Sequence, residues 1–284
     1  MRISSQRVRC IAVAAALAAI PATASAQTKL EARYTAALSG IPLGTGTWVI
    51  DIAADQYTAV ASGRTTGLVR LISDGSGSSG AKGAIQGGNV ASFGYVSNVV
   101  SDKKADEVHF AVQGGVAKDI VAVPPLEPSP DRVPVTDAHR KGIVDPMSAM
   151  LMPVAGKGEM LVPDACKRRL AIFDGRQRAD IELIYKRMDH VRADKGYAGP
   201  VVVCTALYRP VAGHRPSRAA IKHLVEQRDM EIWLAPITGT RVLVPFRFSV
   251  PTPFGLGTLQ ANYFVANEMP TQASRQSPAT AKTQ

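Results

Sequence analysis

The densest group of titratable side chains in the chain runs from Asp137 to Asp145. It places His139 within a few residues of both aspartates, and a histidine beside a carboxylate can act as a general base. The alternative is that Asp145 caps the helix that follows it, while the neighbouring basic side chains stay solvated. We favour this second interpretation and assign no catalytic residue. His139 with Asp137 or Asp145 remains the pair that an enzyme would use.

The other reactive side chains lack the spacing of a known site. The histidines do not show the His-Glu-x-x-His pattern of a zinc enzyme, and no serine lies in the Gly-x-Ser-x-Gly turn of an α/β hydrolase. We therefore predict neither a metal nor a cofactor. The histidines are His109, His139, His190, His214 and His223.

Two further groups of residues suit binding better than catalysis. Met147 and Met150 belong to a short methionine-rich segment, which can hold a flexible apolar ligand or simply pack in the core. Arg176 follows the Asp174-Gly175 turn and can hold an anionic headgroup, although arginines on turns are usually only solvated. Together with Asp137, His139 and Asp145, these three residues form the candidate ligand site.

The first 26 residues have the three zones of an export signal. Three arginines precede the apolar run from Cys10 to Ile20, and Ala24-Ser25-Ala26 supplies the small residues of a cleavage site. We predict cleavage after Ala26 and a periplasmic mature protein. The apolar run is too short to cross a bilayer, and no later run of apolar residues is long enough, so we do not expect the protein to span a membrane.

The formal net charge is +10, and it falls to +7 when the three arginines of the signal are removed. This positive net charge favours anionic partners, for example lipid headgroups or another anionic envelope component. The alternative is that the charge only keeps the protein in solution. The basic residues are not concentrated in long runs, so we expect no nucleic-acid partner.

Two cysteines remain after cleavage, Cys166 and Cys204. An oxidising compartment favours a disulfide between them, and they flank a predicted hairpin that can bring them together. A redox enzyme would need a more closely spaced pair. We predict a structural disulfide.

Alternation of apolar and polar residues predicts a protein built mainly of β-strands. Gly75 to Gly80 resembles a linker in composition, but we expect a bent strand there, because glycine relieves curvature. The predicted strands are 30–39, 46–52, 57–63, 68–73, 85–99, 108–112, 119–123, 169–173, 179–186, 199–208, 230–234, 240–250 and 257–266.

Two short helices interrupt these strands. Asp145 and Pro146 mark the start of the first, which Pro153 ends, and 219–227 is the second, weaker one. The proline-rich connector 124–134 forms neither strand nor helix. We expect one β-rich domain over residues 27–267 and a disordered tail over 268–284.

The order and spacing of several short motifs resemble an uncharacterised family of exported bacterial proteins, classed as a domain of unknown function. The motifs are the Tyr34 hairpin with Gly44-Thr45-Gly46, Asp145-Pro146, Phe173-Asp174-Gly175-Arg176 and Pro253-Phe254-Gly255. The resemblance spans about Leu30 to Glu268. It implies a single large antiparallel sheet, twisted, spiral or barrel-like, similar to envelope-integrity proteins and broadly to lipoprotein carriers. It carries no established catalytic residue.

These features favour a non-enzymatic periplasmic protein that supports envelope integrity by binding an amphiphilic ligand, such as a lipid, or an envelope protein. The alternative is a hydrolase of envelope polymers that uses His139 with Asp137 or Asp145. Whether the sheet closes into a barrel is left open by the strand pattern.

Overall fold

The structure is a computed structural model that describes residues 27–67, 74–102 and 104–269. The export signal predicted over 1–26, the strand predicted over 68–73 and nearly all of the tail expected from 268 onward lie outside these residues. The last described strand continues to Met269, two residues past the expected end of the domain.

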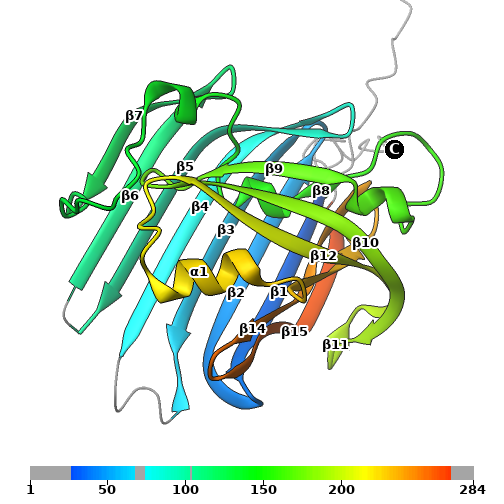
Figure 1. Cartoon of the computed structure of the whole chain (residues 1–284). Helices are drawn as coiled ribbons and strands as arrows, with labels where there is room; N and C mark the ends of the chain where they lie inside the picture. The colour runs from blue at the N-terminus through cyan, green and yellow to red at the C-terminus, as the bar shows by residue number, and fades with distance from the viewer. Residues whose placement is uncertain (1–26, 68–73, 103, 270–284) are drawn as a thin grey trace, which may run out of the picture.

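The described strands form one 15-stranded sheet (Figure 1). Its order is β7-β6-β5-β4-β3-β2-β1-β15-β14-β13-β12-β10-β9, with β8 paired to β14 and β11 to β15. The strands are β1 Gln27–Leu38, β2 Ile41–Ala53, β3 Gln56–Thr65, β4 Gly75–Gln86, β5 Asn89–Ser101, β6 Lys104–Gln113, β7 Val116–Val123, β8 Met152–Pro153, β9 Arg168–Phe173, β10 Arg178–Arg192, β11 Lys195–Gly196, β12 Ala198–Ala212, β13 Glu231–Pro236, β14 Val242–Thr252 and β15 Gly255–Met269. All pairs are antiparallel except the two-residue pair of β11 with β15. The predicted fold class is confirmed.

The apolar alternation explains which side of the sheet carries the core. Leu30, Ala32 and Tyr34 of β1 are buried at every second position, as a strand with one buried face requires. On β2, Trp48 and Ile50 continue the same buried face. The main core forms where these strands pack against residues of β12, β13 and β14.

The predicted strand over 85–99 is wrong in one respect, because a turn divides it. Gly87 and Gly88 have φ angles of 58° and 82°, and two successive positive φ angles are what a tight hairpin turn needs. The glycine-rich run from Gly75 to Gly80 does form a strand, as predicted, within β4.

The predicted helix after Asp145 is also wrong, because only one 3-10 turn forms, η3 Ser148–Met150. The segment lies between Pro146 and Pro153, and Leu151 already has an extended backbone. There is no room for the successive hydrogen bonds that stabilise an α-helix. The second predicted helix is confirmed as α1 Ala219–Glu226, which lies in front of the sheet in Figure 1.

The strand ladder does not close into a barrel, but one segment connects its two edges. The backbone N–H of Ile143 donates to Gly115 O beside β7 at 3.1 Å, while Val144 N–H donates to Ala171 O of β9 at 3.0 Å. Phe173 N–H in turn donates to Val144 O. The edge strands are thus held together by a loop rather than by direct pairing.

The described residues also form 3-10 turns at Asp137–Arg140 (η2) and Pro163–Cys166 (η4). No helix of the described residues has the length and apolar character of a membrane span.

Candidate functional site

A buried carboxylate holds the segment between Pro146 and Pro153 against the sheet. Asp145 has no exposed surface. Its Oδ1 accepts hydrogen bonds from the backbone N–H groups of Met147 and Ser148, both at 2.9 Å. Its Oδ2 accepts from the hydroxyls of Ser92 and Ser148, both at 2.5 Å. Asp145 therefore accepts from backbone N–H groups at the start of this turn, as a capping side chain does, although Met147 occupies the N-cap position and the predicted α-helix is only one 3-10 turn.

The network continues to β3, because the Tyr57 hydroxyl donates to Ser148 Oγ at 2.5 Å. Burial raises the pKa of Asp145, and the hydrogen bonds from Ser148 and Ser92 only partly oppose this effect. Burial also raises the pKa of Tyr57. Among the described residues no cation pairs with Asp145, so the carboxylate is held by neutral donors alone.

A cleft of about 790 Å³ opens directly above this network. The turn Gly87–Gly88, the segment 142–155 and β9 surround it, together with the loop that precedes β9. Its apolar lining consists of Val90, Ile143, Val144, Ala149, Leu151, Pro153, Val154, Ala155, Val162, Ala165, Leu170 and Ala171. Lys167, Arg168 and Arg169 lie along one side, and Glu159 and Asp164 also contribute to the lining.

The disulfide predicted between Cys166 and Cys204 is present, with the two Cα atoms 5.6 Å apart. It ties η4 to the middle of β12. Arg168 connects the same turn to β8, since its side chain donates to the carbonyl oxygens of Ala165 in η4 and Pro153 in β8. The wall of the cleft that carries the cations is therefore fixed covalently and by hydrogen bonds.

Met147 and Met150 do not belong to the lining of this cleft. Met147 is 3% exposed and lies in the main core, and Met150 packs against that core from its edge. Both methionines therefore pack in or against the core, which is one of the two roles that the sequence allowed for them.

His139 and the two aspartates are not brought together. The His139 ring accepts a hydrogen bond at Nδ1 from the backbone N–H of Thr136, at 3.1 Å. Asp137 pairs with Arg140 at 3.3 Å, and Asp145 is occupied as described above. Within the described part of the chain, His139 has no hydrogen bond to a carboxylate.

Arg176 lies apart from the cleft, and its guanidinium is already engaged. It donates to Pro124 O at 2.6 Å and to Asp106 at 3.2 Å, and its side chain is only 12% exposed. Arg178 is similarly occupied by Asp180. Both arginines fasten the β9–β10 turn to neighbouring segments.

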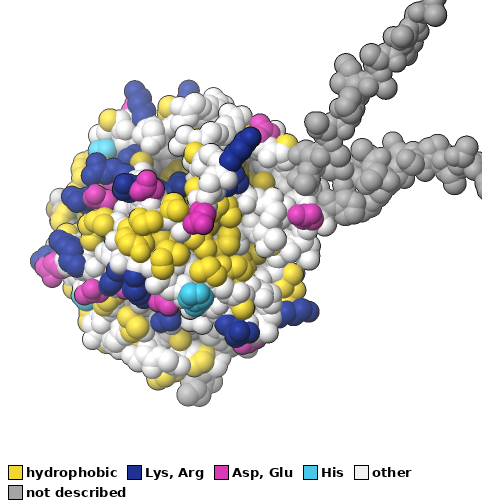
Figure 2. Space-filling view, turned by 90° about the vertical axis from the view of Figure 1, so that its right-hand side faces the viewer, with side chains coloured by type: hydrophobic (Ala, Val, Ile, Leu, Met, Phe, Trp, Pro, Cys, Tyr) yellow, Lys and Arg dark blue, Asp and Glu magenta, His cyan; other side chains and the backbone are white. Residues whose placement is uncertain are grey.

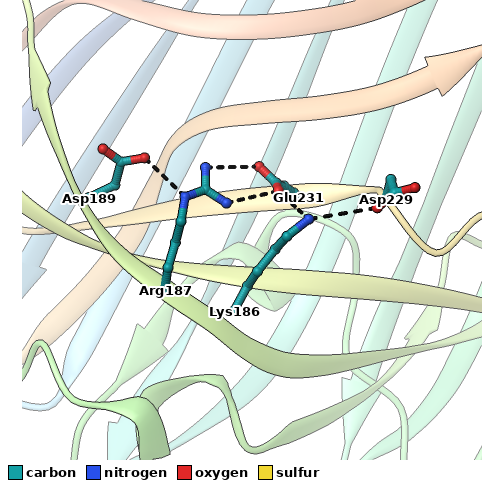
Figure 3. Close-up of polar contacts among 5 residues, drawn as sticks. All are labelled: Lys186, Arg187, Asp189, Asp229 and Glu231. Atoms are coloured by element: carbon teal, nitrogen blue, oxygen red, sulfur yellow. Dashed lines mark hydrogen bonds and ion pairs between the residues drawn. The ribbon is translucent and has the colours of Figure 1, made fainter.

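An ion-pair network that sequence spacing did not reveal connects β10 to β13 (Figure 3). Glu231 accepts from Lys186 at 2.6 Å and from Arg187 at 2.9 Å, and Arg187 also pairs with Asp189. The second contact of Lys186 is Asp229. Burial opposes ionisation of Glu231, but hydrogen bonds from the two cations outweigh this effect and lower its pKa.

This network is a structural clamp, because each carboxylate and cation in it already has a partner. Arg187 also lies over the ring of Trp233, 5.4 Å from its centroid. The signal in the sequence was weak, because the two adjacent cations have one acid, Asp189, close to them, while Glu231 lies 44 residues after Arg187. No group of three or more possible metal ligands occurs in the described ranges.

The fold and the cleft thus define a protein made of one strongly curved β-sheet, with a cleft of mixed polar and apolar lining above a buried polar network. The chain belongs to the family described as protein of unknown function (DUF3108), whose model matches residues 32–262. The resemblance to an uncharacterised family, which the sequence motifs indicated, is therefore confirmed. No protein with a curated description matches.

One solved structure with a similar chain trace is the crystal structure of a beta-barrel-like protein of the domain of unknown function DUF1849 from Brucella abortus. The two proteins are 11% identical, with a TM-score of 0.49, over 86% of this chain and 99% of the other.

Proposed function

We propose that the protein is a non-enzymatic component of the bacterial cell envelope, which binds an amphiphilic ligand in the cleft above Asp145. The observation that carries the proposal is the composition of this cleft, whose lining combines apolar side chains with polar ones and has three consecutive cations, Lys167 to Arg169, on one side. Its volume of about 790 Å³ lies in the range of small-molecule sites.

Export to the periplasm is part of this proposal. The zones of residues 1–26 support it, and the Cys166–Cys204 disulfide is compatible with it. In that compartment the available amphiphiles are lipids and their fragments, which suits a role in envelope integrity.

The test is native mass spectrometry of the mature protein purified from its own periplasm, followed by lipid analysis under denaturing conditions. We expect a defined amphiphile to be released. Titration of delipidated protein with a fluorescent fatty acid should then give saturable binding.

A matched pair of variants locates the site. Ala155→Trp places a large ring at the mouth of the cleft and should weaken binding of the fluorescent fatty acid by about tenfold or more. Ala105→Trp is the control, because Ala105 is also exposed but lies on β6, away from the cleft. A clean mass without ligand and no uptake of the probe by the wild type would reject the proposal.

A further inference from the structure

The three cations beside the cleft also border a second cavity. A groove of about 450 Å³ is lined by Pro163, Lys167, Arg168, Arg169, Glu182, Leu183, Ile184 and Tyr185. Lys167, Arg168 and Arg169 line both this groove and the cleft above Asp145. We call these three residues the cationic ridge. The ridge therefore borders two cavities, and both have apolar side chains in part of their lining.

The second groove exposes more apolar surface than folding alone requires. Ile184 is 47% exposed and Tyr185 is 38% exposed, and Met188 of the same strand is 42% exposed. Figure 2 shows a group of hydrophobic side chains on this side of the molecule, bordered by lysine, arginine and acidic side chains. Contiguous exposed apolar surface with a polar rim is typical of a binding surface.

Two of the ridge cations are available to an anion. Lys167 pairs with Asp164 at 2.7 Å, and Arg169 approaches Glu182 at 3.8 Å, with cation side chains that are 75% and 62% exposed. Exposed ion pairs contribute little to stability, so a phosphate can replace the carboxylate partner at small cost. Arg168 is different, because its bonds to two carbonyl oxygens hold the ridge in place.

We propose that the ligand is an anionic amphiphile with two apolar chains, whose headgroup lies on the cationic ridge and whose chains enter one cavity each. This inference rests on the proposed function and deepens it, since the cleft is the same site. A single-chain ligand fills the cleft and leaves Ile184 and Tyr185 in water. A two-chain ligand covers them, while its headgroup contacts Lys167 and Arg169.

The test compares three soluble probes by calorimetric titration of the delipidated full-length mature protein. Dihexanoylphosphatidylglycerol has two chains and a negative headgroup, dihexanoylphosphatidylcholine has two chains and no net charge, and hexyl phosphate has one chain and a negative headgroup. We expect the first to bind about tenfold or more tightly than either of the others.

Variants separate the contributions of the ridge and the groove. Ile184→Ser should weaken the two-chain anionic probe several-fold and leave hexyl phosphate unchanged. Ile41→Ser is its control, because Ile41 is 62% exposed and lies on β2. Lys167→Gln combined with Arg169→Gln should weaken both anionic probes, whereas Arg192→Gln combined with Lys222→Gln removes the same charge elsewhere and should weaken neither.

Equal affinity for one-chain and two-chain anionic probes, with no effect of Ile184→Ser, would overturn the two-chain inference and leave the proposed function intact. Equal affinity for the neutral and anionic two-chain probes would overturn the role of the ridge. Failure of the wild type to bind any of the three, together with the fluorescent fatty acid, would reject the proposed function as well.

Discussion

Asp145 shows how one side chain can fix a segment that has almost no regular structure. Its two oxygens accept four hydrogen bonds, from two backbone N–H groups and two serine hydroxyls. Because the carboxylate is buried and no cation faces it in the described part of the chain, these bonds are its entire stabilisation. The segment beneath the cleft depends on them.

Asp145→Asn should lower the free energy of unfolding by about 1–3 kcal/mol, since an amide nitrogen cannot accept at least one of the bonds and leaves a buried donor without a partner. Urea unfolding of the mature protein measures the change. Asp164→Asn is the control, because Asp164 is 73% exposed and should shift stability by less than about 0.5 kcal/mol. Equal effects of the two changes would contradict the assigned role.

The same residue gives a prediction about pH. Burial raises the pKa of Asp145 in the folded state, so the folded protein binds this proton more tightly than the unfolded chain, whose aspartates titrate near about 3.9. The contribution of Asp145 to the free energy of unfolding is therefore greatest below the pKa of this residue in the unfolded chain. It decreases as the pH rises toward the pKa of Asp145 in the folded protein. The difference in unfolding free energy between wild type and Asp145→Asn should widen as pH falls from 7 to 4. A difference that narrows would contradict the raised pKa.

At the scale of elements, the short turn η4 and the strand β12 are joined only through side chains. The disulfide between Cys166 and Cys204 spans 38 residues of sequence. A closed loop of this length stabilises the folded state by roughly 3–4 kcal/mol in the chain-entropy model.

The double variant Cys166→Ser with Cys204→Ser should lose roughly that amount, measured by urea unfolding at neutral pH. Denatured, unreduced wild-type protein should contain no free thiol by Ellman titration if the mature chain begins after Ala26. Two free thiols would show that the bridge is not formed in the purified protein.

The ion-pair clamp joins two strands that are not neighbours, since β12 lies between β10 and β13. Glu231→Gln removes the carboxylate that Lys186 and Arg187 share. Because both cations are about one-third exposed or more, we expect a loss of about 1 kcal/mol or less, and a smaller loss in 1 M salt. Thermal unfolding at two salt concentrations measures it. A salt-independent loss would show that packing, not charge, is responsible.

At the scale of the whole molecule, the two ends of the sheet meet where the β9–β10 turn packs on β6. Gly175 has a φ of 94° and faces Val108 so closely that a Cβ atom would overlap its side chain. Phe173, at the end of β9, packs with Phe110 of β6 at 5.6 Å between ring centroids. This contact brings the two edges of the open sheet together.

Gly175→Ala should therefore cost about 1–3 kcal/mol more than Gly40→Ala. Both glycines have a φ well above the ordinary left-handed range, 94° for Gly175 and 82° for Gly40, but Gly40 has open space where a Cβ would lie. The comparison separates backbone strain, which the two variants share, from the close approach of the sheet edges. Equal costs would show that the close approach is unimportant.

Local patterns determined most of the strands and the disulfide of this protein. Period-2 alternation predicted β1 and β2, a strongly apolar run predicted β12, and Asp174-Gly175 predicted the β9–β10 hairpin, because strand formation and turn chemistry depend on neighbouring residues. The α-helix predicted after Asp145 is a single 3-10 turn between two prolines, and its hydrogen bonds to Ser92 and Tyr57, which lie far away in the chain, could not be predicted from local patterns.

Only the tertiary structure decided where the cleft lies and which residues line it. Lys167 to Arg169 gave a short run of charge in the sequence, but their position beside two cavities depends on the curvature of the sheet and on the packing of the loop before β9. The same folding separated His139 from Asp145 and buried Met147. Sequence order constrains neighbours along a strand, whereas a binding site needs residues from several strands, and their distances are set by how the whole sheet bends.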